Sequence, residues 1–296
     1  MTQLHTISFQ CEHTQVEGIT DTLESFGALS ITYSDAHNEA LYQTDVGESP
    51  LWQVTRITAY FSLDTDIDAV TNTLLSIEDM HIETQTIAAD QDWVTQTQER
   101  FPPQCFGERL WVIPSWTDSS HFNGPLIRIN PGLAFGTGCH PTTALCLRWI
   151  AQRLPLNCTV LDYGCGSGIL SLAALSAGAR AATAVDHDPL ALFATHNNRD
   201  LNPEFAQRLS ISTPQNTPIA TFDVIIANIL LNPLITLAPQ IKQHAHSGTA
   251  LILSGVLRDK IDRLITTYGQ LGFVAIRAEY QEEWAMIHLS YRASNE

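Results

Sequence analysis

The sequence predicts two domains: a small α+β domain, then an α/β domain whose mostly parallel sheet ends in an antiparallel hairpin. Three observations predict this. The 296 residues, 44% of them hydrophobic, exceed what one small domain needs. In the first third of the chain, the apolar segments follow the order strand, helix, strand, strand, helix, strand, whereas single strands and helices alternate in the rest of the chain. The last two apolar runs, residues 273–280 and 283–291, lack the intervening helix that a parallel connection requires.

Residues 1–89 are predicted to form the small domain. A strand over residues 5–11 is followed by a helix over residues 15–26, which places Val16, Ile19, Leu23 and Phe26 on one stripe and stops at Gly27. Two strands, a second helix beginning at Asp66 and a last strand follow. The resulting order of strand, helix, strand, strand, helix, strand is that of the split-βαβ, ferredoxin-like unit.

Residues 90–106 are predicted to connect the domains, because this segment is polar and ends in Pro-Pro-Gln-Cys-Phe. Residues 107–296 form the predicted α/β domain. In it, buried strands such as CTVLDYG and FDVIIAN alternate with helices such as GILSLAALSAGA and PLITLAPQIKQH. Ligands of such sheets bind at the carboxyl ends of the strands, so the residues that end each strand are the first candidates for a site.

The negative charge of the chain is concentrated in its first part. Residues 1–129 contain 19 Asp or Glu against four Lys or Arg, a net charge of −15, whereas residues 130–296 have a net charge of −1. An acidic surface makes nucleic acid a poor partner and a cationic protein a good one. Solubility alone is the alternative explanation.

The strongest local motif is the segment VLDYGCGSGIL, in which a strand leads through a glycine-rich loop into a helix. Its glycines are Gly164, Gly166 and Gly168. They let a ligand approach the backbone where the amides of the following helix are free. A dinucleotide fingerprint would require a third glycine where Ile169 stands, and no Walker lysine follows. With Asp162 before it, the loop matches the D-x-G-x-G-x-G pattern that binds S-adenosylmethionine.

Asp186 supports the same cofactor. It ends the next predicted strand, 22 residues after Gly164, where a carboxylate accepts hydrogen bonds from both ribose hydroxyls of an adenosine. Asp188 precedes Pro189 at the start of a helix and is predicted to cap it, and His187 between the two carboxylates is predicted to be a turn residue.

Asn228 ends the apolar strand FDVIIAN and leads into ILLNPL. Its side-chain amide is predicted to accept a hydrogen bond from an amine nucleophile at the carboxyl edge of the sheet. A strand-ending turn residue is the alternative.

Taken in order, the segments GALSITYSD, FGERLWVIPSW, PGLAFGTGCHPTT, LDYGCGSGIL, ANILLNPL, LSGVL and EEWAMI cover the chain nearly end to end. In this it resembles the methyltransferases that modify the large-subunit ribosomal protein L-eleven. The resemblance implies a class I methyltransferase fold after a ferredoxin-like domain that recognises the basic ribosomal protein. It implies S-adenosylmethionine as cofactor and places Thr143, Gly164, Asp186 and Asn228 at positions that contact it. Transfer to the N-terminal α-amine and to lysine ε-amines is implied in the same way.

The uncharged segment 130–143, NPGLAFGTGCHPTT, is then expected to form the lid and wall of the cofactor pocket. Thr143 would begin a helix facing the methionine end, and the absence of charge suits a dry channel for methyl transfer. His140 is a candidate general base, with a structural hydrogen-bonding role before Pro141 as the alternative.

Other classes of protein fit the sequence less well. No apolar run is long enough to span a membrane and the N-terminus lacks a secretory signal, so we expect a cytoplasmic protein. The six cysteines form no C-x-x-C pair, so no metal site is expected. Four alternatives stay open. The chain could be a methyltransferase of another basic protein, or one acting on glutamine or adenine nitrogen, although the N-P-P-[YF] motif of the latter is not matched. It could also be a nicotinamide-dependent oxidoreductase or a non-catalytic binding module.

Overall fold

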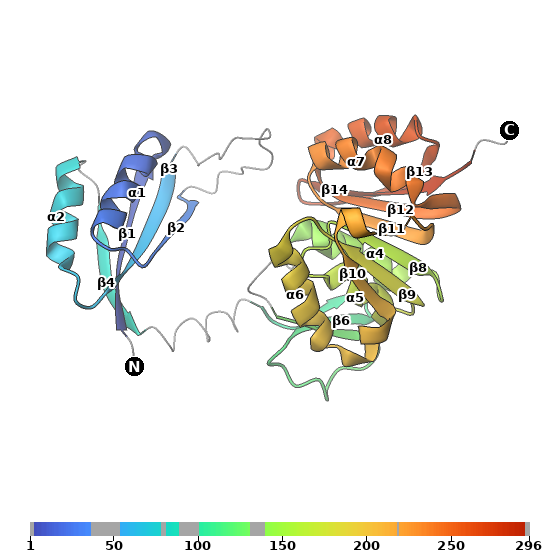
Figure 1. The fold of residues 1–296 in the computed structure, drawn as a ribbon, viewed down its shortest axis with the longest axis horizontal. Helices are drawn as coiled ribbons and strands as arrows, with labels where there is room; N and C mark the ends of the chain where they lie inside the picture. Colours follow the sequence, from blue (N-terminus) through green and yellow to red (C-terminus); the bar gives the residue numbers. More distant parts are fainter. Residues whose placement is uncertain are drawn as a thin grey trace. The chain divides into compact units, whose positions relative to one another are not determined.

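The computed structural model describes residues 3–36, 54–77, 81–88, 101–130, 140–217 and 219–293. The chain divides into two compact units, Met1–Arg100 and Phe101–Glu296 (Figure 1). Each unit has a buried apolar core of its own.

The first unit contains one antiparallel sheet with two helices on one face (Figure 1). Its elements are β1 (Gln3–Glu12), η1 (His13–Gln15), α1 (Val16–Ser25), β2 (Ser30–Asp35), β3 (Val54–Ser62), α2 (Ile67–Ile77) and β4 (Glu83–Ala88). The strand order β2-β3-β1-β4 confirms the predicted ferredoxin-like arrangement. Residues alternate between buried and half-buried along β3, because every second side chain faces the helices. Gly27 ends α1 with φ of +79°, as predicted.

The second unit is built on a seven-stranded sheet. Its strands are β8 (Thr159–Tyr163), β9 (Ala181–Val185), β10 (Leu209–Ser212), β11 (Phe222–Asn228), β12 (Ala245–Leu257), β13 (Phe273–Gln281) and β14 (Trp284–Tyr291). Their order is β10-β9-β8-β11-β12-β14-β13. The pairs from β10 to β12 are parallel, and β14 is antiparallel to both β12 and β13. The predicted parallel sheet with a terminal antiparallel hairpin is confirmed.

Helices cover both faces of this sheet (Figure 1). They are α4 (Pro141–Arg153), α5 (Ile169–Ser176), α6 (Pro189–Asp200), α7 (Leu231–Gln243) and α8 (Ile261–Gly269), with short 3-10 turns η2 (Pro203–Arg208), η3 (Pro214–Asn216) and η4 (Arg258–Lys260). One apolar core lies between the sheet and the α4–α6 layer, and another lies under α7 and α8. Among the described residues no helix has the length and apolar character needed to cross a membrane.

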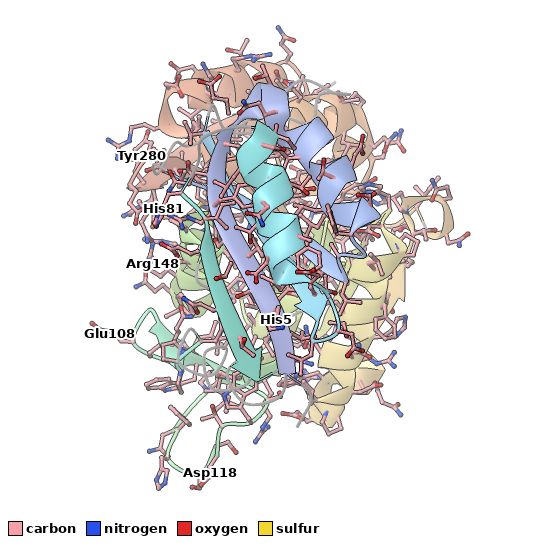
Figure 2. The ribbon with its side chains drawn as sticks, turned by 90° about the vertical axis from the view of Figure 1, so that its left-hand side faces the viewer. His5, His81, Glu108, Asp118, Arg148 and Tyr280 are labelled. Carbon is pink, nitrogen blue, oxygen red and sulfur yellow. The ribbon has the colours of Figure 1, made fainter. Side chains whose placement is uncertain are left out.

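A small three-stranded sheet, which the sequence patterns do not predict, precedes the large one. It consists of β5 (Gln104–Phe106), β6 (Leu110–Pro114) and β7 (Leu126–Ile129). The loop after β6, which carries Asp118, projects at the end of the unit opposite α8 (Figure 2). The first strand of this small sheet, β5, overlaps the predicted connector. It pairs with β6 and buries Phe106. The rest of the predicted connector up to residue 100 lies outside the described residues.

Candidate active site

A cavity of about 1050 Å³ lies in the second unit, at the edge where the parallel strands β8, β9 and β11 end. The parallel strands bring together residues that are far apart in the sequence, because all of their carboxyl ends meet at this edge. Of the predicted site residues, six line the cavity: His140, Thr143, Gly164, Gly166, Asp186 and Asn228.

The glycine-rich loop leaves β8 and enters α5. All three of its glycines have positive φ, between +53° and +79°, a region that other residues rarely adopt. Gly164 also lies so close to Ile229 that a Cβ on it would come 2.3 Å from the Cγ2 of Ile229. Gly168 begins α5 and packs on Thr195 rather than on the cavity wall. The loop therefore exposes its backbone to the cavity at Gly164 and Gly166.

Asp162 lies beneath this loop and does not line the cavity. Its side chain is fully buried, and its Oδ2 accepts hydrogen bonds from the backbone N–H of Ser171 at 3.0 Å and from the Ser171 hydroxyl at 2.8 Å. Burial raises its pKa to about 7, against the hydrogen bonds from Ser171, which lower it. Asp162 thus holds the first turn of α5 under the loop, a position that the sequence motif alone does not distinguish from direct contact with a ligand.

Asp186 follows β9 and reaches the cavity wall. Its Oδ2 accepts from the backbone N–H of Gly166 at 2.9 Å, and its Oδ1 accepts from the N–H of Asp188 at 3.1 Å. Asp188 caps α6 by accepting from the N–H of Leu190 at 2.9 Å, with Pro189 in the first turn, as predicted. The exposed ring of His187 lies 3.4 Å from Asp186 Oδ1. Asp186 is the wall carboxylate attached to the glycine loop.

Asn228 lies on the cavity wall beside the first turn of α4. Its Nδ2 donates to the hydroxyl of Thr143 at 3.1 Å, and Thr143 is itself buried in the first turn of α4. The Oδ1 of Asn228 is buried and has no hydrogen-bond partner among the described residues. A buried acceptor without a donor costs free energy, so this atom is positioned to receive a donor from a ligand.

His140 caps α4. Its Nδ1 accepts from the backbone N–H of Thr142 at 3.3 Å and lies 2.7 Å from the Thr142 hydroxyl. Burial lowers the pKa of His140, although the carboxylates of Glu282 and Glu283 act to raise it. A ring that is neutral and accepts at Nδ1 carries its proton on Nε2. The structural role is therefore present in the structure, and the general-base role stays a prediction.

Three further wall residues are missed by motif reasoning. Tyr163 donates to Gln240 of α7 at 3.2 Å, and Trp284 of β14 stacks edge-on against His140 with ring centroids 4.9 Å apart. Tyr163 directly precedes Gly164 in the glycine-rich motif, whereas Gln240 and Trp284 reach the cavity through packing between elements distant in the sequence. The resemblance of the segment EEWAMI was the one sequence signal near Trp284.

The cavity wall contains no Lys or Arg among its described residues, and its carboxylates are Asp186 and Asp188. Residues 131–139, the centre of the expected lid, lie outside the described residues. Within the described residues no group of three or more His, Cys, Asp or Glu side chains is arranged to hold a metal ion.

The donor set fits S-adenosylmethionine. An adenosine and a sulfonium require a roomy cavity with a close backbone, here at Gly164 and Gly166, and a carboxylate at the end of the adjacent strand. The cavity wall also carries Asn228, whose amide oxygen has no partner among the described residues. Together with the sheet order and the terminal hairpin, these features define a class I S-adenosylmethionine-dependent methyltransferase.

Comparison with known proteins identifies the family. The family model described as "Ribosomal protein L11 methyltransferase (PrmA)" matches residues 3–292. The ribosomal protein L11 methyltransferase of Nitrosococcus oceani is 40% identical over 286 residues, which cover 95% of this chain and 97% of that protein. That of Legionella pneumophila is 41% identical over 280 residues, covering 94% and 95%. The chain belongs to the ribosomal protein L11 methyltransferase family, whose members depend on S-adenosylmethionine.

A solved structure agrees. The crystal structure of ribosomal protein L11 methylase from Lactobacillus delbrueckii subsp. bulgaricus is 29% identical, with a TM-score of 0.56. The match covers 64% of this chain and 99% of the chain in that crystal structure. Membership of the family decides between the alternatives left open by the sequence in favour of protein methylation.

Proposed function

We propose that the second unit methylates amines of ribosomal protein L11, the N-terminal α-amine and lysine ε-amines, and that Asn228 receives the amine. The Oδ1 of Asn228, a residue of the cavity wall, carries this proposal, because it has no hydrogen-bond partner among the described residues. A neutral amine has N–H donors for that oxygen, and accepting one of them orients the nitrogen lone pair into the cavity.

The other wall residues divide the remaining tasks. The exposed backbone of Gly164 and Gly166 and the carboxylate of Asp186 would hold the adenosine part of S-adenosylmethionine, with Asp186 accepting from the ribose hydroxyls. Thr143 fixes the amide of Asn228, so that Nδ2 is engaged and Oδ1 faces the amine. When bound, S-adenosylmethionine supplies an electrophilic methyl group on a sulfonium sulfur.

The proton on the amine sets how difficult the reaction is. A lysine with a pKa of about 10.4 must lose its proton at a cost of roughly 4.6 kcal/mol near pH 7, whereas an α-amine near 7.8 needs only about 1 kcal/mol. Nearby carboxylates would raise the amine pKa and increase this cost. The segment Asn228–Leu234 carries no carboxylate, which supports deprotonation of the amine beside Asn228.

We propose that residues 1–89 recognise the basic substrate, residues 90–106 connect, and residues 107–296 carry the reaction. The net charge of −15 on residues 1–129 supports the first assignment, because L11 is a basic protein. Strand β5 at Gln104–Phe106 already belongs to the second unit. The site of action would be the cytoplasm, where ribosomes are assembled.

Isotope-labelled S-adenosylmethionine, purified L11 and the full chain test the function together. We expect label on L11, located by mass spectrometry at its α-amine and at lysines. An unlabelled L11 in the presence of cofactor-bound protein would contradict the proposal, and label confined to glutamine or backbone nitrogen would contradict the amine assignment.

A further inference from the structure

Ser254 and Gly255, near the C-terminal end of β12, contact three other elements around the cavity: α4, β14 and the segment after β11. Ser254 is fully buried and pairs with Asn228 as the last register pair between β12 and β11. Gly255 lines the cavity. The mechanism described above assigns no role to either residue.

The hydroxyl of Ser254 links the wall elements. Its Oγ lies 3.0 Å from the backbone carbonyl of Ala285 on β14 and 3.3 Å from the carbonyl of Thr142 on α4. Thr142 directly precedes Thr143, whose hydroxyl accepts from Asn228 Nδ2. One buried hydroxyl therefore ties the first turn of α4 to the strand beside Asn228.

Gly255 interrupts the pairing of β12 with β14. The register shifts between Ser254 and Val256, which makes Gly255 the extra residue of a β-bulge, with φ of +86°. A Cβ at this position would lie 2.4 Å from the carbonyl oxygen of Ile229 and 3.0 Å from its backbone nitrogen. Bulges next to active sites redirect neighbouring residues, and here the bulge lets the backbone after Asn228 approach β12 closely.

We propose that Ser254 and Gly255 are positioning residues for methyl transfer, and this rests on the proposed role of Asn228. Ser254 holds α4 at Thr142, so that Thr143 keeps the Asn228 amide turned with Oδ1 toward the amine. Gly255 sets the path of the Asn228–Ile229 backbone. Both act through Asn228.

The test of Ser254 uses Ser254→Ala in two backgrounds, wild type and Asn228→Ala, in the full chain. With L11 and S-adenosylmethionine saturating, we expect Ser254→Ala to lower kcat about tenfold in the wild-type background and less than twofold in the Asn228→Ala background. Thr249→Val is the matched control. It removes an equally buried β12 hydroxyl, which donates to Phe222 O at the far end of the strand, and it should leave kcat within about twofold.

Equal losses from Ser254→Ala in both backgrounds, or no loss in either, would overturn the proposal. A general structural defect would give the first result, and it would also lower the melting temperature more than Thr249→Val does. Failure of the wild type to label L11 would instead count against the proposed function.

Gly255→Ala tests the close approach between the Ile229 backbone and β12. Its control is Gly248→Ala on the same strand, where φ is +96° but no atom lies within 4 Å of the added Cβ. We expect Gly255→Ala to lower kcat at least tenfold more than Gly248→Ala, since only the former displaces Ile229. Equal kcat values for two folded variants would contradict the role of Gly255.

Discussion

Two carboxylates at the ends of neighbouring strands do different work because their surroundings differ. Asp186 reaches the cavity, whereas Asp162 is fully buried beneath the glycine loop. One oxygen of Asp162 accepts hydrogen bonds from Ser171, and the other has no partner among the described residues. Sequence spacing places both at the correct edge of the sheet. It does not reveal which one is covered, because that depends on how α5 packs over the strand end.

The raised pKa of Asp162 predicts how the free energy of unfolding depends on pH. The folded pKa of about 7 exceeds the ordinary aspartate pKa of 3.8, so between these pH values the folded state binds more protons than the unfolded state. Stability contributed by the neutral acid is therefore lost as pH rises through 7. Relative to Asp162→Asn, we expect the wild type to lose about 2–3 kcal/mol of unfolding free energy between pH 5 and pH 8.

Urea unfolding of both proteins at the two pH values measures this difference, and the comparison cancels the histidines that also titrate. A difference that stays constant with pH would show that Asp162 is ionised throughout and contradict the prediction.

Asp186 should control cofactor affinity. Asp186→Ala removes the acceptor predicted for two ribose hydroxyls, and charge-assisted hydrogen bonds contribute about 1.5–3 kcal/mol each. We expect the Kd for S-adenosylmethionine, measured by calorimetry, to rise at least tenfold. His196→Ala, which removes an exposed histidine of α6 outside the cavity wall, is the control and should change Kd less than threefold.

At the scale of elements, the strand–glycine loop–helix unit was predictable because its chemistry is local. Its glycines and the helix that follows occupy consecutive positions, and the structure confirms them. The sheet of β5, β6 and β7 was not predicted, because short strands carry too few residues for periodicity to show. The walls formed by Tyr163, Gln240 and Trp284 depend on contacts between distant elements, which spacing does not encode.

The glycine loop also fits against the segment after β11. Gly164→Ala would place a Cβ 2.3 Å from Ile229 Cγ2 at a φ of +79°. We expect a loss of about 2–4 kcal/mol in unfolding free energy, against about 1 kcal/mol for Gly248→Ala, which has positive φ but open space. Adding Ile229→Ala should recover at least about 1 kcal/mol in a double-mutant cycle. Strictly additive losses of unfolding free energy would show that the Cβ at residue 164 does not clash with Ile229.

At the scale of the whole molecule, the negative charge and the cavity lie in different parts of the chain. The carboxylates are concentrated in residues 1–129, whereas the described part of the cavity wall carries only Asp186 and Asp188. Attraction of a basic protein and deprotonation of its amine make opposite demands on nearby negative charge, and the separation meets both.

This separation predicts how salt acts. Raising the ionic strength from about 0.05 to 0.3 M screens surface attraction, since the Debye length falls below about 10 Å. We expect KM for L11 to rise severalfold while kcat stays within about twofold, as followed by steady-state transfer of labelled methyl groups. A KM that does not respond to salt would show that the acidic charge serves solubility alone.

The most direct test of the account is the single-turnover rate of methyl transfer to L11 by Asn228→Ala, with S-adenosylmethionine and L11 both saturating. If Asn228 Oδ1 holds the amine, the rate falls at least about a hundredfold even though the cofactor is saturating. A rate equal to that of the wild type would contradict the account.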